Sequence, residues 1–410
     1  PIELRMINGM KDGAVTHTRQ VLGKVAYTET LKKCSEIAGW EVGSSRVRGS
    51  VRKDIKGSQI AEPYIPGKEF KSEEAMKLCR DRFKYGRGVG TGWYGIGRCA
   101  TIDKAGAFVE IDDGGTAMIL TGVSEIGEGI LTVLTQIAAD ELGMYPEDIT
   151  IGDNDTARVP EAAHVGASRQ TYMIGNAVCN ACRDVKKKFI REMAAYWNID
   201  SSSICMKNRR IYVEGNAQYN LSLKEAVDIC KKIRGIVPLG SGTYTAHHEG
   251  LDPVDGRGNP WQAYVFGTQI AEVAVDTFTG EVHVLGIWAA HDVGRVINPR
   301  GVEGQIEGGA VQSMGQTIME NYVLSEGVPT NKNFAKYILP TSVDVPEIHS
   351  YLVEERDPFS PVGAKGIGEP APLPTAPAIV NAIYDAVGVR ITSLPAIPEK
   401  ILNEISKMKN

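Results

Sequence analysis

Glu369 is the carboxylate whose sequence surroundings best suit acid–base chemistry. It lies in the stretch Pro361–Ala378, with glycines at 363, 366 and 368 before it and prolines at 370, 372 and 374 after it. The glycines allow the backbone to approach a ligand closely, and the prolines stiffen the chain beyond the carboxylate. A glutamate fixed in this way can act as a general base. These residues alone leave open the alternative of a solvated glutamate in a surface loop.

A helix is predicted directly after this loop. Thr375 is its expected N-cap, Pro377 falls in its first turn and Gly388 is its expected end. The glutamate would therefore stand on a rigid loop that leads into a helix.

Two further glycine-rich turns stand at predicted helix starts. Gly122–Gly129 follows a predicted hairpin, 107–111 and 116–121, and precedes a helix that runs through Leu142. Glycines at such a place expose backbone N–H groups that can cradle a phosphate. Gly166–Gln170 opens a second helix, which continues to about Trp197, and offers a glycine, a hydroxyl, a guanidinium and an amide as anion donors. A plain N-cap at Ser168 would explain the second turn equally well.

Composition narrows the class of protein. The 410 residues are 42% hydrophobic and 23% charged, which is ordinary for a globular protein of two or three domains. A net charge of -5 gives no broad basic surface, so nucleic acid and anionic membranes are not expected partners. No apolar run of membrane-spanning length and no signal peptide is present, and we expect a cytoplasmic protein.

The remaining chemical motifs give weaker predictions. The seven histidines form no HExxH, HxH or Cys/His set, so direct ligation of a metal by the protein is not expected. The seven cysteines favour reduced thiols, and the pair Cys179 and Cys182 is interpreted as core residues of a helix. A literal GxGxxG occurs at Gly90–Gly95, but a glycine-rich strand or loop and a hairpin follow it, so NAD binding is only weakly supported.

Six segments in order resemble the xanthine dehydrogenase family of molybdenum hydroxylases. The resemblance is to the C-terminal half of the molybdopterin-binding large subunit and covers nearly the whole chain. It rests on the segments Thr121–Gly129, Gly166–Val178, Tyr264–Asp276, Ala289–Pro299, Val302–Gly309 and Lys365–Pro370.

The resemblance implies a role for each matching residue. Glu369 would be the family's base, which deprotonates a hydroxyl on molybdenum, and Gln312 would hydrogen-bond the pterin. The other residues that it assigns to cofactor binding are Gly127, Glu128, Gly129, Gly166, Ala167, Ser168, Arg169, Gln170 and Gly368. No metal ligand is expected from the chain, because the family holds molybdenum through the pterin dithiolene.

The sequence departs from the family pattern in two places. Glu128 stands where the family usually has glutamine, which puts a cofactor contact in doubt. The Phe-Thr pair of xanthine-oxidising members falls on Gly97 and Arg98, which makes xanthine itself a weaker expectation.

The fold implied by the resemblance is α+β, with two mixed α/β lobes around a cofactor cleft. We expect residues 1–70 to form an extended segment and linker, 71–260 a first lobe with the glycine-loop contacts and a variable insert, and 261–410 a second lobe with the Glu369 loop. The elements expected in these parts are helices at 28–39, 71–84 and 301–322 and strands at 149–152, 263–276 and 280–291.

The implied activity is hydroxylation of an N-heteroaromatic substrate, purine- or nicotinate-like, with water as the oxygen source. The cofactor would be molybdenum-molybdopterin in its cytosine dinucleotide form. The partners would be the N-terminal half of the molybdopterin subunit, an iron-sulfur subunit with [2Fe-2S] clusters and an FAD subunit. The alternatives are a family member that converts aldehydes, carbon monoxide or aroyl thioesters, and a non-catalytic homologue.

Overall fold

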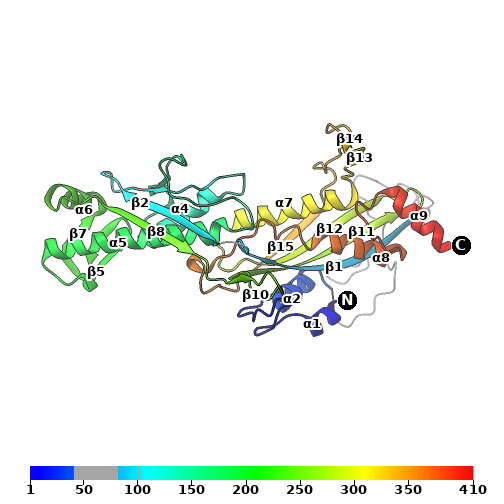
Figure 1. Cartoon of the computed structure of the whole chain (residues 1–410), viewed down its shortest axis with the longest axis horizontal. Coiled ribbons are helices and arrows are strands. Elements are labelled where there is room, and N and C mark those ends of the chain that lie inside the picture. Colours follow the sequence, from blue (N-terminus) through cyan, green and yellow to red (C-terminus); the bar gives the residue numbers. More distant parts are fainter. Residues whose placement is uncertain (41–81, 100–101, 410) are drawn as a thin grey trace.

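The chain forms two lobes that lie end to end (Figure 1). This computed structural model describes residues 1–40, 82–99 and 102–409. The linker expected at 41–70 and residues 71–81 of the expected helix 71–84 lie outside the described residues. Phe83 and Lys84, at the end of that expected helix, begin a strand instead.

The first lobe is a four-stranded sheet packed against two helices. The strand order is β4-β3-β2-β8, with β2 antiparallel to both of its neighbours and β3 parallel to β4. Its strands are β2 (Lys104–Ile111), β3 (Ala117–Leu120), β4 (Ile149–Ile151) and β8 (Leu239–Thr245), and its helices are α4 (Ile130–Leu142) and α5 (Gly175–Trp197). A small antiparallel sheet lies at its outer end, made of β5 (Ile204–Lys207), β6 (Arg210–Val213) and β7 (Asn216–Ser222), next to α6 (Leu223–Asp228).

The second lobe is a four-stranded sheet with helices on both faces. The strand order is β1-β11-β12-β15, from β1 (Phe83–Gly95), β11 (Tyr264–Asp276), β12 (Val282–Asp292) and β15 (Glu347–Val353). Its helices are α1 (Ile2–Asn8), α2 (Tyr27–Ile37), α7 (Pro299–Ile318), α8 (Thr375–Val387) and α9 (Pro398–Lys409). Ala271 packs in one core with α8, while its neighbour Ile270 packs in another with α2. Successive residues of a strand point to opposite faces, so β11 is buried along its whole length.

Alternating glycines let a helix lie directly on a strand in each lobe. A Cβ at Gly86, Gly88 or Gly90 would stand 2.0–2.1 Å from a carbonyl oxygen of α8 or the residue before it. On β8, a Cβ at Gly240 or Gly242 would stand 2.2–2.3 Å from a carbonyl oxygen of α5. The literal GxGxxG of the sequence is therefore part of a packing surface. The two helices fixed in this way, α8 and α5, are the ones that follow the Glu369 loop and the Gly166–Gln170 turn.

Most of the predicted elements are present, with three corrections. The hairpins β2–β3 and β11–β12 and the glycine stops at Gly143 and Gly388 are confirmed. Thr375 is the first residue of α8 and not its N-cap, because its hydroxyl donates to Gln269. The expected lobe boundary at 71 does not fit β1, which pairs with β11 along its whole length. The expected variable insert at 200–260 supplies β8, a strand of the main sheet of the first lobe.

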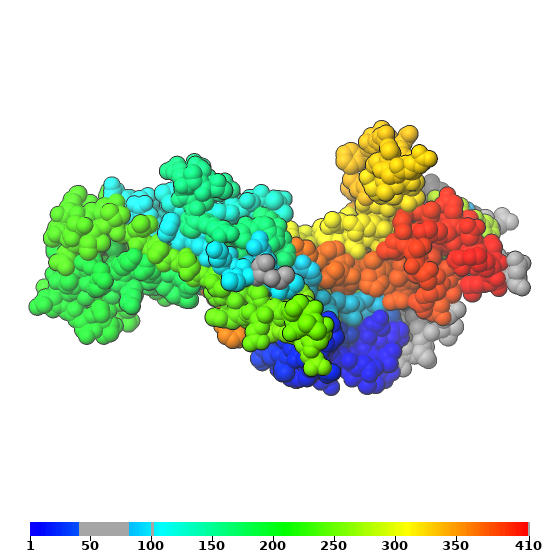
Figure 2. All heavy atoms as spheres, viewed as in Figure 1, coloured from blue at the N-terminus to red at the C-terminus, as the bar shows by residue number. Residues whose placement is uncertain are grey.

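One segment projects from the second lobe (Figure 2). It follows α7 and carries the short hairpin of β13 (Leu324–Ser325) and β14 (Val328–Pro329). Another short hairpin, β9 (Gly250–Leu251) with β10 (Gly258–Asn259), precedes β11. Within the described residues, no helix combines the length and the apolar composition that crossing a membrane requires.

Candidate active site at the junction of the lobes

The Glu369 loop is anchored at its base by a buried ion pair. Lys365 Nζ lies 2.6 Å from Asp292 Oδ2, and both side chains are almost fully buried. The Lys365 N–H also donates to the Val293 carbonyl (2.9 Å), next to the end of β12. Burial raises the pKa of Asp292 to about 6, against the lowering effect of Lys365. The loop that carries the glutamate is therefore attached to the central sheet of the second lobe.

Ser168 contacts the glutamate from the first lobe. Its hydroxyl donates to Glu369 Oε2, and the Glu369 N–H donates back to Ser168 Oγ (3.1 Å). A Cβ at Gly366 would stand 1.9 Å from the Ser168 carbonyl oxygen, so the two backbones touch there. Gly368 lies beside the same hydroxyl. The structure thus brings together the two stretches that the sequence singled out separately.

The Gly166–Gln170 turn has an unusual backbone. Gly166, Ala167 and Ser168 have φ values of +144°, +55° and +48°. A positive φ at a residue with a side chain, such as Ala167 or Ser168, costs on the order of 1–3 kcal/mol of conformational energy. Within the described chain, no acceptor binds the N–H groups of Ala167 and Ser168. A strained turn with two open donors next to a carboxylate is typical of a functional site.

Arg169 supports this turn from the inside. The guanidinium is fully buried and binds Asp103 Oδ1 through Nε (2.9 Å) and NH2 (2.6 Å). Further N–H groups donate to the carbonyls of Ala162, His164 and Lys104. The guanidinium is therefore occupied within the protein and does not face a ligand, contrary to its expected use as an anion donor.

The Gly122–Gly129 turn differs from the expected phosphate cradle. The N–H groups of Gly127 and Gly129 both donate to Glu125 Oε1, and that of Leu131 donates to Oε2. Burial alone would raise the pKa of Glu125, but the hydrogen bonds that its carboxylate accepts outweigh burial, and the net effect is a lowered pKa. A carboxylate of the chain occupies the position that a phosphate would take.

Glu128 and Gln170 are joined by a direct hydrogen bond. Gln170 Nε2 donates to Glu128 Oε1 at 2.6 Å, and Glu128 Oε2 accepts the Ile126 N–H. The acidic residue at this position therefore belongs to a polar link between the two glycine-rich turns of the first lobe. Gln312 is exposed on α7, and within the described chain no side-chain hydrogen bond connects it to these residues.

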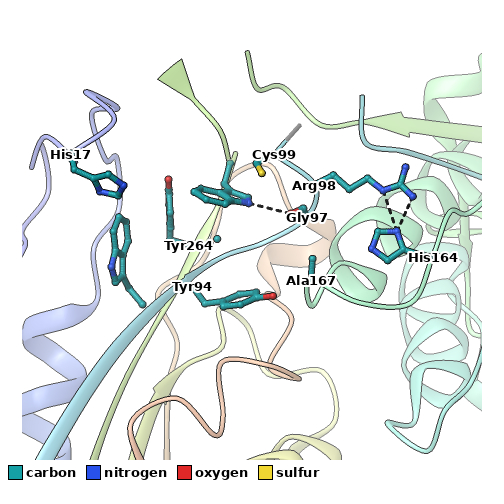
Figure 3. A pocket seen from close by; sticks show the side chains of 11 residues that line it. His17, Tyr94, Gly97, Arg98, Cys99, His164, Ala167 and Tyr264 are labelled. Atoms are coloured by element: carbon teal, nitrogen blue, oxygen red, sulfur yellow. Dashed lines mark hydrogen bonds between the residues drawn. The ribbon is translucent and has the colours of Figure 1, made fainter. Parts of the chain in front are cut away.

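A cavity of about 660 Å³ opens beside these residues (Figure 3). Eleven residues line it, from both lobes: His17, Trp93, Tyr94, Gly95, Gly97, Arg98, Cys99, His164, Ala167, Trp261 and Tyr264. Ser168, which binds Glu369, directly follows the lining residue Ala167, and Glu369 Oε1 lies 3.9 Å from the place where a Cβ of Gly166 would stand, so the glutamate is close to the cavity wall. The cavity and the carboxylate therefore form one site.

Three residues of this region were missed by sequence reasoning. Asp103 is the partner of Arg169, Tyr94 lines the cavity with a pKa raised by burial and by the charge of Glu369, and His164 receives hydrogen bonds from Arg98. A buried arginine needs a carboxylate, and that requirement could have prompted a search for Asp103. Tyr94 and His164 gave no signal, because they stand alone in glycine-rich or polar sequence.

The histidines and cysteines behave largely as their sequence positions predict. His291 and Asp292 point to different partners, Gln269 and Lys365, as adjacent strand residues should. Burial raises the pKa of Cys179 to about 12, and that of Cys182 is raised as well, as expected for thiols in a core. Among the residues that the structure describes, no three His, Cys, Asp or Glu side chains gather in a way that could hold a metal ion.

A family model for the molybdopterin cofactor-binding domain matches residues 65–346. The chain belongs to this family. Two curated relatives support the assignment: a probable xanthine dehydrogenase subunit from Bacillus subtilis, 33% identical over 77% of this chain and 41% of the relative, and an aldehyde oxidoreductase of Megalodesulfovibrio gigas, 31% identical over 81% of this chain and 34% of the relative. The resemblance to molybdenum hydroxylases noted in the sequence is confirmed.

Solved structures of molybdopterin-binding proteins share the fold. Quinoline 2-oxidoreductase of Pseudomonas putida 86 matches with a TM-score of 0.80 at 24% identity, over 99% of this chain and 49% of that one. Aldehyde oxidoreductase of Desulfovibrio desulfuricans matches with a TM-score of 0.74 at 26% identity, over 98% of this chain and 38% of that one. The expected α+β class is confirmed. The chain spans less than half the length of these relatives.

The residues around Glu369 suit a bound molybdopterin cofactor. The open N–H groups of Ala167 and Ser168 can donate to an anionic oxygen. The residues fit such a cofactor at the Gly166–Gln170 turn better than at the Gly122–Gly129 turn.

Proposed function

We propose that this molybdopterin-binding chain is the catalytic part of a hydroxylase that oxidises an N-heteroaromatic substrate, purine- or nicotinate-like, with water as the oxygen source. The observation that carries the proposal is the position of Glu369, which Ser168 holds at the edge of an aromatic-walled cavity. When bound, the molybdenum cofactor supplies a two-electron acceptor at this place. The protein supplies the proton acceptor, the substrate cavity and the backbone donors.

The proposed base is Glu369 Oε1. Oε2 already accepts the Ser168 hydroxyl, so Oε1 is the oxygen that can receive a proton. Oε1 lies 3.9 Å from the place where a Cβ of residue 166 would stand, so it is close to the turn that carries the open N–H groups. A general base at this point lies within reach of a reacting group bound against the turn.

The proposed cofactor contacts are those of the two glycine-rich turns. Ala167 and Ser168 would donate backbone N–H groups, while Gly166 and Gly368 would leave room for close approach. Glu128, with Gly127 and Gly129 of the same turn and with Gln170 hydrogen-bonded to it, would supply a second contact, and Gln312 would bind the pterin from α7. Arg169 would act only by supporting the turn. We propose the cytosine dinucleotide form of the cofactor.

The proposed enzyme works in the cytoplasm as one chain of a complex. The relatives are about twice as long or longer, and one is described as the gamma subunit of a 6-hydroxypseudooxynicotine dehydrogenase complex in Paenarthrobacter nicotinovorans. We propose that a chain equivalent to the N-terminal half of the molybdopterin subunit completes the site. Subunits with [2Fe-2S] clusters and FAD would carry the electrons away.

A base substitution tests the proposal directly. In the complex purified with its partners, Glu369→Gln is expected to reduce turnover about 10²- to 10⁴-fold because the proton acceptor is lost. Molybdenum content and released nucleotide, measured on the same samples, should stay unchanged. Glu303→Gln, an exposed change on α7, is the matched control and should leave turnover unaltered.

Two results would contradict the proposal. Turnover of Glu369→Gln within about tenfold of wild type would remove the base assignment. Absence of molybdenum from the wild-type complex would favour a non-catalytic homologue. The same preparation, tested with aldehydes, carbon monoxide and aroyl thioesters, distinguishes the N-heteroaromatic substrate from those of other members of the family.

A further inference from the structure

The cavity next to Glu369 has walls that suit a flat aromatic molecule. Trp93 stacks on Tyr264 with ring centres 4.8 Å apart, and Trp261 meets Tyr264 edge-on at 5.8 Å. Trp261 is held in place by its Nε1–H, which donates to the Gly97 carbonyl (3.1 Å). A volume of about 660 Å³ lies within the usual range for small-molecule sites.

Arg98 gives this aromatic cavity a positive charge. Among the described residues that line it, none is Asp or Glu. In the described part of the chain, the Arg98 guanidinium has no carboxylate at ion-pair distance; its hydrogen-bond partner is His164. Arg98 is only partly exposed, so this charge is partly desolvated. A partly desolvated cation without an anion is costly, and a bound anion would offset that cost.

His164 orients the guanidinium. Arg98 Nε and NH2 lie 3.1 and 2.8 Å from His164 Nδ1 (Figure 3). Because the guanidinium can only donate, His164 Nδ1 is the acceptor of this contact. This contact uses one edge of the guanidinium. The edge formed by NH1 and NH2 has no acceptor among the described residues, and such an edge matches a carboxylate through two parallel hydrogen bonds.

The charged end of the cavity lies close to the proposed base. The place where a Cβ of Gly166 would stand is 3.5 Å from His164 Nε2 and 3.9 Å from Glu369 Oε1. A single aromatic ring can therefore bring one edge to Glu369 while a substituent on another edge reaches Arg98. The spacing suits an anion carried on the substrate's own ring.

We propose that Arg98, oriented by His164, is a specificity-determining residue that selects aromatic substrates bearing a carboxylate. This inference deepens the proposed function and rests on it only in calling the ligand a substrate. A free phosphate group is a poorer match, because the open N–H of Ala167 is proposed to bind the cofactor, and the NH1–NH2 edge of Arg98 that remains matches a flat carboxylate better than an anion that needs donors on several sides.

Calorimetric titration tests the proposal without turnover. The purified complex is titrated with benzoate, with benzamide, which has the same shape and no charge, and with inorganic phosphate. We expect benzoate to bind about 10- to 100-fold more tightly than benzamide, as a charge-assisted bidentate contact implies, and phosphate to bind weakly. Added salt should weaken benzoate binding and leave benzamide binding unchanged.

Substitutions assign the effect to Arg98. Arg98→Met should abolish the preference for benzoate while changing benzamide affinity less than about threefold, and Arg98→Lys should keep part of the preference because a single ammonium cannot form the fork. Arg257→Met, an exposed arginine on the β9–β10 loop, is the control and should behave as wild type.

Several results would overturn the proposal. They are equal affinity for benzoate and benzamide, no benzoate binding at millimolar concentration, an equal loss of both ligands in Arg98→Met, and phosphate binding as tightly as benzoate. If Arg98→Met fails to fold, the wild-type complex still tests the proposal, because benzoate binding that does not weaken with added salt would contradict it. A complex without molybdenum that still prefers benzoate would refute the proposed function and leave this site intact.

Discussion

Substitution of Gly88 by alanine should disturb the active site by displacing helix α8, which packs directly on this glycine. Gly88 lies on β1 against α8, five residues before the first cavity-lining residue of that strand, Trp93. An added Cβ would stand 2.1 Å from the Ala378 carbonyl oxygen and 2.2 Å from the Ala382 nitrogen. Backbone atoms cannot rotate away as a side chain can, so α8 must move off the sheet by more than an ångström.

The expected loss follows from this displacement. Overpacking of a core costs about 1–3 kcal/mol and can cost more when backbone is involved. The start of α8 is continuous with the Glu369 loop, and a misplacement of about 1 Å at a catalytic group can lower turnover about 100-fold. Gly88→Ala should therefore lower the free energy of unfolding and the turnover together, although residue 88 contacts no ligand.

The assay pairs denaturant unfolding with turnover of the purified complex. Gly304→Ala is the matched control: it is exposed on α7, nothing lies within 4 Å of the added Cβ, and alanine in a helix stabilises by about 0.5–1 kcal/mol. Gly242→Ala on β8 should repeat the Gly88 result through α5 and the Gly166–Gln170 turn. Wild-type stability and turnover in Gly88→Ala would refute the claim that direct strand–helix contact positions the base.

Three further changes test neighbouring contacts. Ser168→Ala removes the hydroxyl that binds Glu369 and should lower turnover about 10- to 100-fold, with unchanged molybdenum content, when steady-state rates are compared. Lys365→Met leaves Asp292 buried without its partner and should cost about 3–5 kcal/mol in denaturant unfolding; a loss below about 1 kcal/mol would contradict the anchoring role. Burial lowers the pKa of His291 to about 4, so the stability that its neutral form contributes is present above pH 6.5 and is lost as pH falls through 4. The stability advantage of wild type over His291→Gln should therefore shrink by about 3 kcal/mol between pH 7 and pH 4, and a constant difference would show that His291 does not titrate in this way.

The features of the site that depend on residues close in sequence could be predicted, whereas the contacts between residues distant in sequence could not. Glu369 could be chosen because glycine and proline act on their own neighbours, and the end of α8 at Gly388 follows from the same kind of signal. The contact between Ser168 and Glu369 joins residues 201 positions apart, and no short-range pattern encodes it. Each of the two stretches could be predicted to be functional, but only the structure shows that they meet.

Two wrong predictions have physical causes. The helix expected at 71–84 is wrong at Phe83 and Lys84, which begin β1, whereas the glycine-dense strand or loop expected after it is present as a strand. Alternating glycines give no hydrophobic period, so their packing role is visible only when α8 lies on them. The place of Arg169 at a helix start predicts an anion donor. Its guanidinium turns inward instead, because Asp103 offers a buried carboxylate that no sequence pattern locates there.

Contacts within this chain hold the proposed base, Glu369, in position, whereas we propose that another chain completes the wall of the cavity. Besides the Ser168 contact, Tyr172 donates to Asp357 (3.0 Å) and Asn176 to the Phe359 carbonyl (2.9 Å), so the start of α5 is tied to the segment that leads to Glu369 at three successive points. Side-chain contacts of this kind, added to backbone contact, hold a catalytic group within the tolerance of about 0.5 Å that chemistry requires. His164, which lines the cavity, is by contrast exposed to solvent. If another chain completes the site, changes in that chain should alter which ring is admitted, while the ability to remove a proton should depend on the junction described above.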